Sequence, residues 1–298
     1  MKSNCKLSIR AVSLGDELRQ IAPLAQSIGY HGLQLDMAIG QLALSELSAS
    51  GAREVRHIIS SSNLELDSLC AGIPGEMLIS ANQHDRVLWM FKKVLRAATA
   101  LSVGICCLDL GRIPGVPQEI VARPKTRLAS NLIIIPEPTP IEPLEPQIDP
   151  KELTAWDGID VIMRELGAMA EDAGILLAFS TDLSSFASLS RLLAGARCHW
   201  LGVDLDPVSI LRDRWDIERI LDTVGASIRH IRGRDAIRGS AGRTQPATVG
   251  QGSTNWPQTL RLLDSGGYSG WIAIDTVELP DRAAAAQRAL THLIPKES

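Results

Sequence analysis

Acidic and basic side chains gather at the ends of several short apolar runs. Asp204 and Asp206 alternate in LGVDLD, His230 and Arg232 alternate in SIRHIR, and Asp275 ends GWIAID. Carboxylates with an imidazole or a guanidinium could move a proton on a small substrate, stabilise an enediolate or hold a divalent cation. We therefore take His230, Arg232, Asp206 and Asp275 as the candidate catalytic residues.

Strand alternation predicts that these groups share one face. Ile272 and Ile274 should meet neighbouring helices, which turns Asp275 toward the other side. The same parity applies to the other polar residues at the strand ends, so that charged groups converge on one mouth. The predicted ligand-binding residues are Gln34, Asp36, Ser180, Asp182, Asp204, Arg234, Arg238 and Arg243.

The last three of these residues lie in the stretch after SIRHIR. Arg234, Arg238 and Arg243 could clamp a phosphate or a carboxylate through paired hydrogen bonds, or form an ordinary solvated loop. With Arg232 they motivate the hypothesis that the mouth binds an anionic small molecule.

Repeated β-strand and α-helix signals must position these residues. The predicted strands are residues 5–12, 32–36, 64–70, 103–110, 175–180, 200–206, 227–232 and 270–275. The predicted helices are residues 16–28, 41–60, 84–101, 153–173, 184–196, 214–224, 256–266 and 281–293. Eight strands, each followed by a helix, predict the α/β class and a single-domain (β/α)8 TIM barrel, whose functional sites lie at the carboxyl ends of the strands.

One segment interrupts this alternation. Residues 113–150 contain nine of the sixteen prolines, which cannot maintain a regular helix or a central strand. We expect a Pro-rich insertion after the fourth strand, either beside the mouth as a lid or arm, or as a passive spacer.

Composition limits the partners. The chain has 298 residues, 30 Lys+Arg against 34 Asp+Glu and a formal net charge of −4, with no basic tract of the kind that binds a nucleic-acid backbone. No apolar run approaches the roughly 20 residues that cross a bilayer. Five irregularly spaced cysteines predict reduced core residues. We therefore expect a cytoplasmic protein with a small-molecule partner, no nucleic acid and no membrane, and leave a homo-oligomer open.

Several motifs resemble the xylose isomerase-like TIM-barrel superfamily over nearly the whole chain. GYHGLQLD at residues 29–36 is similar to the family's second strand, and LGVDLDPVS and IRHIRGRD resemble the sixth and seventh. The most specific match is VGQGSTNWPQTLRLLDSGGYSGWIAID, in which Ser253, Thr254 or Asn255 should cap a helix with Pro257 in its first turn.

This resemblance implies isomerisation or epimerisation of a small polyol or sugar phosphate with help from a divalent cation (Mn, Mg or Zn). The family supplies Glu, Asp, His and Glu from the fifth to eighth strands, and here those positions fall on Ser180, Asp206, Arg232 and Asp275. Only two carboxylates remain, so the metal site is degenerate and no cofactor is expected. If a metal binds, its ligands would be Asp206 and Asp275, with His230 added by a register slip.

Three functions follow as hypotheses. The first is a sugar isomerase or epimerase with a sparse metal site. The second performs metal-free chemistry with His230 as the base and Arg232 as the electrophile. The third is a non-catalytic homologue that serves as a binding or scaffold protein.

The sharpest expectation concerns the residue at the place of the metal. Two carboxylates without a counter-charge would repel each other, whereas a guanidinium can bind both. We predict that Arg232 contacts Asp206, Asp275 or both.

Overall fold

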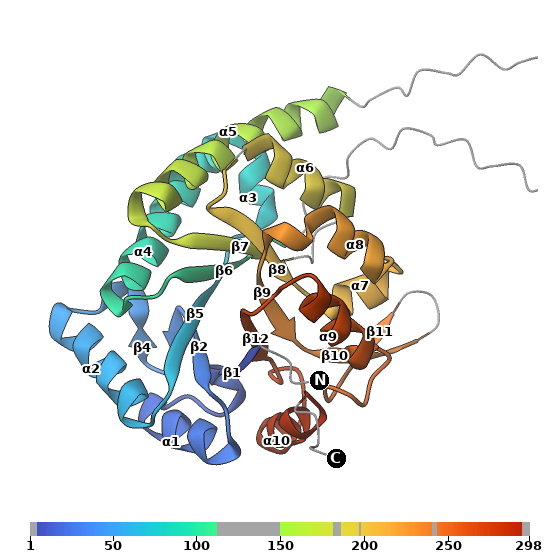
Figure 1. The fold of residues 1–298 in the computed structure, drawn as a ribbon. Coiled ribbons are helices and arrows are strands. Elements are labelled where there is room, and N and C mark those ends of the chain that lie inside the picture. Colours follow the sequence, from blue (N-terminus) through green and yellow to red (C-terminus); the bar gives the residue numbers. More distant parts are fainter. Residues whose placement is uncertain (1–4, 112–149, 181–185, 197, 240–242, 294–298) are drawn as a thin grey trace, which may run out of the picture.

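Eight parallel strands close into a barrel with helices around it (Figure 1). The structure is a computed structural model that describes residues 5–111, 150–180, 186–196, 198–239 and 243–293. The barrel strands are β1 (Lys6–Arg10), β2 (Gly32–Asp36), β5 (Glu65–Gly72), β6 (Ile105–Asp109), β7 (Leu176–Ser180), β8 (Leu201–Leu205), β9 (Ile228–Gly233) and β12 (Trp271–Ile274). Their order is β1-β12-β9-β8-β7-β6-β5-β2, and β1 pairs with both β2 and β12. The predicted (β/α)8 barrel is confirmed.

The described helices surround these strands. They are α1 (Leu18–Ile28), α2 (Ala49–Ser61), α3 (Gly75–Ile79), α4 (His84–Leu101), α5 (Pro150–Ala173), α6 (Phe186–Ala196), α7 (Pro207–Asp213), α8 (Ile217–Val224), α9 (Trp256–Ser265) and α10 (Arg282–Leu293). Asn255 caps α9 by accepting a hydrogen bond from the Gln258 amide, and Pro257 lies in the first turn, as the sequence predicted. Of the predicted Pro-rich segment, residues 113–149 lie outside the described residues, and Pro150 begins α5.

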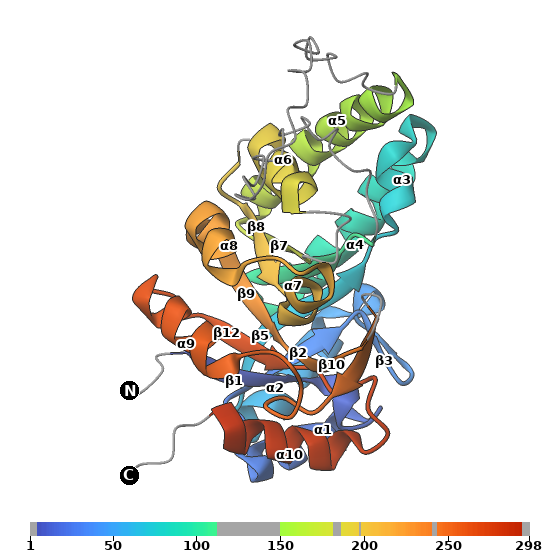
Figure 2. The same cartoon turned by 90° about the vertical axis from the view of Figure 1, so that its right-hand side faces the viewer.

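Two short antiparallel pairs were not predicted. Strands β3 (Ala38–Ile39) and β4 (Leu42–Ala43) follow β2, and strands β10 (Asp235–Arg238) and β11 (Thr244–Ala247) follow β9. Both pairs extend the carboxyl end of the barrel (Figure 2). The first replaces the start of the helix expected over residues 41–60, because Ser48 caps α2 by accepting a hydrogen bond from the Gly51 amide, which places the helix start at Ala49.

Apolar side chains on the outer face of the strands form the main core. Ile9, Leu33, Leu177, Val203 and Ile272 are fully buried in this layer. Cys106 belongs to it, while the neighbouring Cys107 turns into the barrel, as alternation predicts. All five cysteines are free thiols. No described helix is long and apolar enough to cross a membrane.

Polar side chains fill the barrel interior around His230, which has no solvent exposure. His230 Nδ1 lies 2.7 Å from Asp204 Oδ1, and His230 Nε2 lies 3.2 Å from Asp67 Oδ2. Ser8 Oγ donates a hydrogen bond of 2.5 Å to the same Asp67 oxygen. Burial by itself lowers the pKa of His230, but Cys107 and the carboxylates of Asp67 and Asp204 more than offset this and raise it well above its ordinary value. The carboxylates on both sides of the ring therefore favour the charged form of His230.

Close strand packing generates the first prediction. A Cβ on Gly202 would overlap with Arg229 Cγ and lie 2.5 Å from the Ser227 carbonyl oxygen, so the backbone just before β9 would have to move. We expect Gly202→Ala to lower the free energy of unfolding by about 1–3 kcal/mol in chemical denaturation. Gly104→Ala is the matched control, because no atom lies within 4 Å of its Cβ position. Equal stabilities of the two variants would contradict this packing.

The buried imidazolium generates the second prediction. Because the pKa of His230 is raised on folding, its protonation stabilises the protein fully below the ordinary histidine value of about 6.5, and this contribution is lost as the pH rises through the raised pKa. We expect His230→Gln to lower the free energy of unfolding by about 3 kcal/mol near pH 6, and by progressively less as the pH rises through the raised pKa of His230. Urea denaturation across this range measures the difference.

The exposed His57 of α2 supplies the control for that experiment, as His57→Gln. A His230→Gln cost that stays constant with pH would show that the folded protein holds a neutral imidazole.

Candidate functional site

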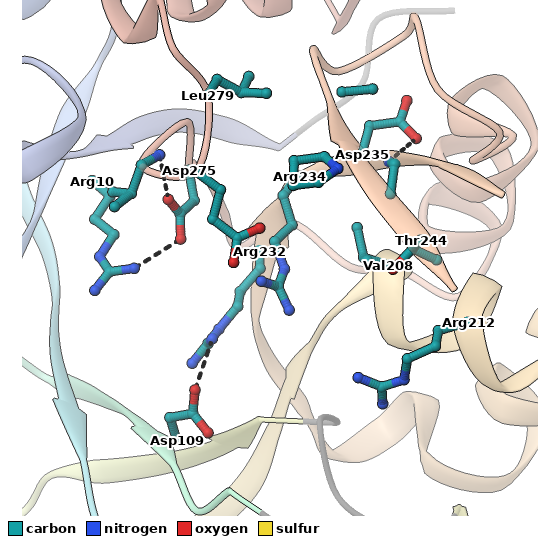
Figure 3. Close-up of a pocket in the computed structure, with 15 residues that line it drawn as sticks. Arg10, Asp109, Val208, Arg212, Arg232, Arg234, Asp235, Thr244, Asp275 and Leu279 are labelled. Carbon is teal, nitrogen blue, oxygen red and sulfur yellow. Dashed lines mark hydrogen bonds and ion pairs between the residues drawn. The ribbon is translucent and has the colours of Figure 1, made fainter. Parts of the chain in front are cut away.

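A cavity of about 510 Å³ opens at the carboxyl end of the barrel (Figure 3). Residues from β1, β6, α7, β9, β10, β11 and the segment after β12 form its wall. The charged residues in the wall are Arg10, Arg212, Arg232, Arg234, Asp109, Asp235, Asp275 and Glu278. The site is therefore rich in both charges.

Arg10 links three neighbouring strands at the barrel's closure. Its Nε donates hydrogen bonds of 3.1 Å to both oxygens of Asp36 on β2, and its Nη1 donates one of 2.8 Å to Asp275 after β12. Sequence reasoning had placed Asp36 and Asp275 at the mouth but had missed Arg10. The sequence signal that could have identified Arg10 is the alternation in β1, where Ser8 and Arg10 lie on the opposite side of the strand from the buried Ile9.

Arg232 lies deeper than predicted. Its Nε donates a 2.6 Å hydrogen bond to Asp204 Oδ2, and its Nη1 lies 3.5 Å from Asp109 Oδ2. Among the described residues no hydrogen bond joins Arg232 to Asp206 or Asp275, so the expected pairing is wrong. The inward parity was right, but the long side chain extends back toward the barrel interior and binds the buried carboxylate there.

Asp206 binds the next arginine instead. Arg234 Nε donates a 2.9 Å hydrogen bond to Asp206 Oδ2, and Asp206 also caps α7 by accepting 3.0 Å and 3.1 Å bonds from the Val208 amide and Ser209 Oγ. Burial alone would raise the pKa of Asp206, but the charge and hydrogen bond of Arg234, the charge of Arg232 and the Val208 amide lower it below its usual range. Asp206 is thus a fixed anion.

The remaining predicted residues occupy different places. Ser180 is fully buried at the end of β7, and Gln34 lies inside the barrel, where its Nε2 donates a 2.9 Å hydrogen bond to Ser68 Oγ. Arg238 and Arg243 are exposed and absent from the cavity wall, and Arg238 donates a hydrogen bond to the Leu211 carbonyl oxygen. Asp182 lies outside the described residues. Two of the four arginines that motivated the hypothesis of an anionic ligand therefore do not line the cavity.

His230 is also separated from the cavity. The cavity wall does not include it, and both ring nitrogens face carboxylates of the interior. Asp204 binds both His230 and Arg232, so it connects the buried histidine to the arginine that lines the cavity.

The residues at the four positions of the family metal do not fit a divalent cation. Ser180 offers no carboxylate, Arg232 brings a positive charge, and the two remaining aspartates are bound by Arg234 and Arg10. Hard divalent cations require several converging oxygen ligands. Here one oxygen of each aspartate binds a guanidinium group and the other accepts a hydrogen bond from a backbone amide.

A different group of side chains lies closer together. Cys107, Asp204 and His230 place one potential ligand atom each within 4.8 Å of one another, all buried. Asp204 already binds His230 and Arg232 through its two oxygens, so an ion at this place would have to displace existing hydrogen bonds.

Asp235 organises the loop that forms one side of the cavity. Its two carboxylate oxygens accept hydrogen bonds of 2.8–3.1 Å from the backbone amides of Ala236, Gly250, Gly252 and Thr254. These bonds attach the β10–β11 hairpin to the loop before α9. Asp235 is therefore a structural part of the wall.

Solved structures with this fold include several sugar enzymes. A xylose isomerase domain protein from Planctomyces limnophilus superposes with a TM-score of 0.70 and 16% identity, covering 98% of this chain and 96% of that one. A 3-keto-D-glucoside 4-epimerase from E. coli gives 0.68 and 13%, covering 97% and 98%. D-psicose 3-epimerase from Clostridium cellulolyticum H10, solved with D-tagatose, gives 0.68 and 14%, also covering 97% and 98%. At these identities the likeness establishes the fold.

No curated protein matches the sequence significantly. The model of the xylose isomerase-like TIM barrel family matches residues 22–295, which is more than nine-tenths of the chain. The protein therefore belongs to the xylose isomerase-like TIM barrel family.

Proposed function

We propose that the protein binds a small polyhydroxylated molecule of the sugar class in the cavity at the carboxyl end of the barrel. The observation that carries this proposal is Arg232 Nη2, a buried nitrogen with no hydrogen-bond partner in a side chain that lines the cavity and is 8% exposed. A buried donor without an acceptor costs about 1–3 kcal/mol. A ligand hydroxyl or carbonyl oxygen would remove that cost.

The surrounding groups suit such a ligand. Fixed guanidinium donors and carboxylate acceptors alternate around the wall, and a polyol presents both kinds of partner. A cavity of about 510 Å³ lies within the usual range for small-molecule sites. The structural relatives include a 3-keto-D-glucoside 4-epimerase and a D-psicose 3-epimerase solved with D-tagatose, which supports the same ligand class here.

The arrangement favours an isomerase-like binding protein over proton transfer by His230. The guanidinium of Arg232 could polarise a ligand carbonyl, as the metal-free hypothesis requires. The proposed base, however, is fully buried, has both ring nitrogens against carboxylates and does not line the cavity. Binding is therefore our first assignment, and isomerisation or epimerisation would need another base.

Arg232→Lys tests the binding role. Lysine keeps the charge beside Asp204 but removes Nη2, so we expect affinity for neutral ketoses such as D-fructose and D-tagatose to fall by about tenfold or more in calorimetry. Arg238→Lys, outside the cavity wall, should leave affinity unchanged. If no sugar of any charge binds the unaltered protein, the proposal is wrong.

Metal removal provides a separate prediction. Because guanidinium groups already bind the two family aspartates, dialysis against EDTA should leave sugar affinity unchanged. Elemental analysis before and after dialysis is the accompanying measurement. A stoichiometric metal whose removal abolishes binding, and whose retention depends on Asp206 and Asp275, would restore the metal-dependent hypothesis.

A further inference from the structure

Carboxylates outnumber guanidinium groups around the cavity. Four arginines and four acidic residues line the wall. Directly behind it, Asp36, Asp204 and Asp206 bind Arg10, Arg232 and Arg234 respectively. The wall and these partners therefore contain seven carboxylates against four guanidinium groups, a local excess of three negative charges. The buried pair of His230 with Asp67 adds one charge of each sign and leaves this excess unchanged.

Two carboxylates of the wall are available to a ligand. Glu278 is exposed and has no ion pair with any other described residue. Asp109 has a side chain that is 39% exposed; its Oδ1 accepts a 3.0 Å hydrogen bond from the Gly111 amide, while its Oδ2 has only a weak contact, at 3.5 Å from Arg232 Nη1. The other wall acids are used: Asp275 binds Arg10 and Asp235 binds backbone amides. The excess negative charge is thus presented to the cavity by Asp109 and Glu278.

This distribution disfavours an anionic ligand. A cavity with excess carboxylate concentrates cations and repels phosphate or carboxylate groups. A bare divalent cation is also a poor fit, because within the described part of the chain only Cys107, Asp204 and His230 bring three potential ligand atoms within 4.8 Å of one another. The acidic residues of the cavity wall do not bring three ligand atoms that close together. An organic molecule, by contrast, can place its charged group and its oxygen atoms at separate points of the cavity.

We propose that the ligand is an amino sugar or a similar polyol with a protonated amine. One of its oxygens accepts a hydrogen bond from Arg232, whose Nη2 has no partner, and its ammonium group lies against Asp109 and Glu278. This inference rests on the proposed sugar-binding function and specifies its ligand class.

The experiment compares molecules that differ at one substituent. Calorimetry at low ionic strength is performed with D-glucose, D-glucosamine and D-glucuronate, and with D-fructose and 1-amino-1-deoxy-D-fructose. We expect at least one amine to bind about tenfold tighter than its neutral parent, and the acid to bind more weakly. Added salt should reduce the advantage of the amine, because it screens charge attraction.

Isosteric variants identify the carboxylates. The double variant Glu278→Gln with Asp109→Asn should remove most of the affinity ratio between amine and neutral sugar, while the neutral sugar still binds. Glu171→Gln, which changes an exposed acid at the end of α5, is the control and should preserve the ratio.

The outcomes separate the two proposals. If neutral sugars bind but neither amine binds tighter, or the acid binds tightest, the amino-sugar inference is overturned and sugar binding stands. If the double variant keeps the ratio, the inference is also overturned, because the ammonium would then lie elsewhere. If none of the five molecules binds, sugar binding itself is wrong and the inference falls with it.

Discussion

Buried charge must be compensated, and this requirement organises the barrel from its interior to its mouth. Asp204 has no solvent exposure, and its two oxygens bind His230 and Arg232. An ionised group in such a place is tolerated only when it is paired and hydrogen-bonded. The pKa of Asp204 is lowered despite its burial, since the two cations beside it outweigh the loss of solvation. The guanidinium of Arg232 is thereby held at the boundary between the interior and the cavity.

The same kind of pairing closes the barrel. The side chain of Arg10 spans from Asp36 on the second strand of the fold to Asp275 at the end of the last, so one guanidinium connects both neighbours of β1. Hydrogen bonds from one rigid guanidinium to two carboxylates define direction as well as distance. The strand contact that brings the two ends of the chain together therefore also shapes one side of the cavity.

The sequence predicted the strands because their apolar alternation is strong, and it predicted the inward faces for the same reason. Strand alternation shows on which side of the sheet a side chain lies, but not how far along the barrel axis its end group extends. The sequence therefore did not predict which carboxylates the arginines bind. Asp204 pairs in register with His230, which places Arg232 nearly level with Asp206 along the barrel axis. The Arg232 side chain nevertheless extends one pleat inward to Asp204. Arginine has a long flexible stem, so its charge can lie away from its own Cα level, and only packing decides in which direction.

The hairpins and the cavity shape had weaker signals. Strands of two to four residues, such as β3 and β10, are too short to show a periodic pattern in the sequence. The sequence also does not distinguish Asp235 from other acidic residues, because its role depends on four backbone amides that donate to it in the fold. Such contacts depend on chain segments that meet only in the folded protein.

Arginine pairs in place of a metal change how a site recognises its ligand. A metal ion offers exchangeable coordination positions, and its affinity depends on the protonation of its ligands. A guanidinium remains charged over the whole range in which proteins fold, and its donors point in fixed directions. Most donors at this mouth are already used by aspartates. In the binding proposed above, selectivity would depend on the groups that the described network leaves available, which include one nitrogen of Arg232 and the carboxylates of Asp109 and Glu278. A site of this kind is built by the chain itself, and the proposed ligand would have to match the charges and hydrogen-bond donors that the network leaves unused.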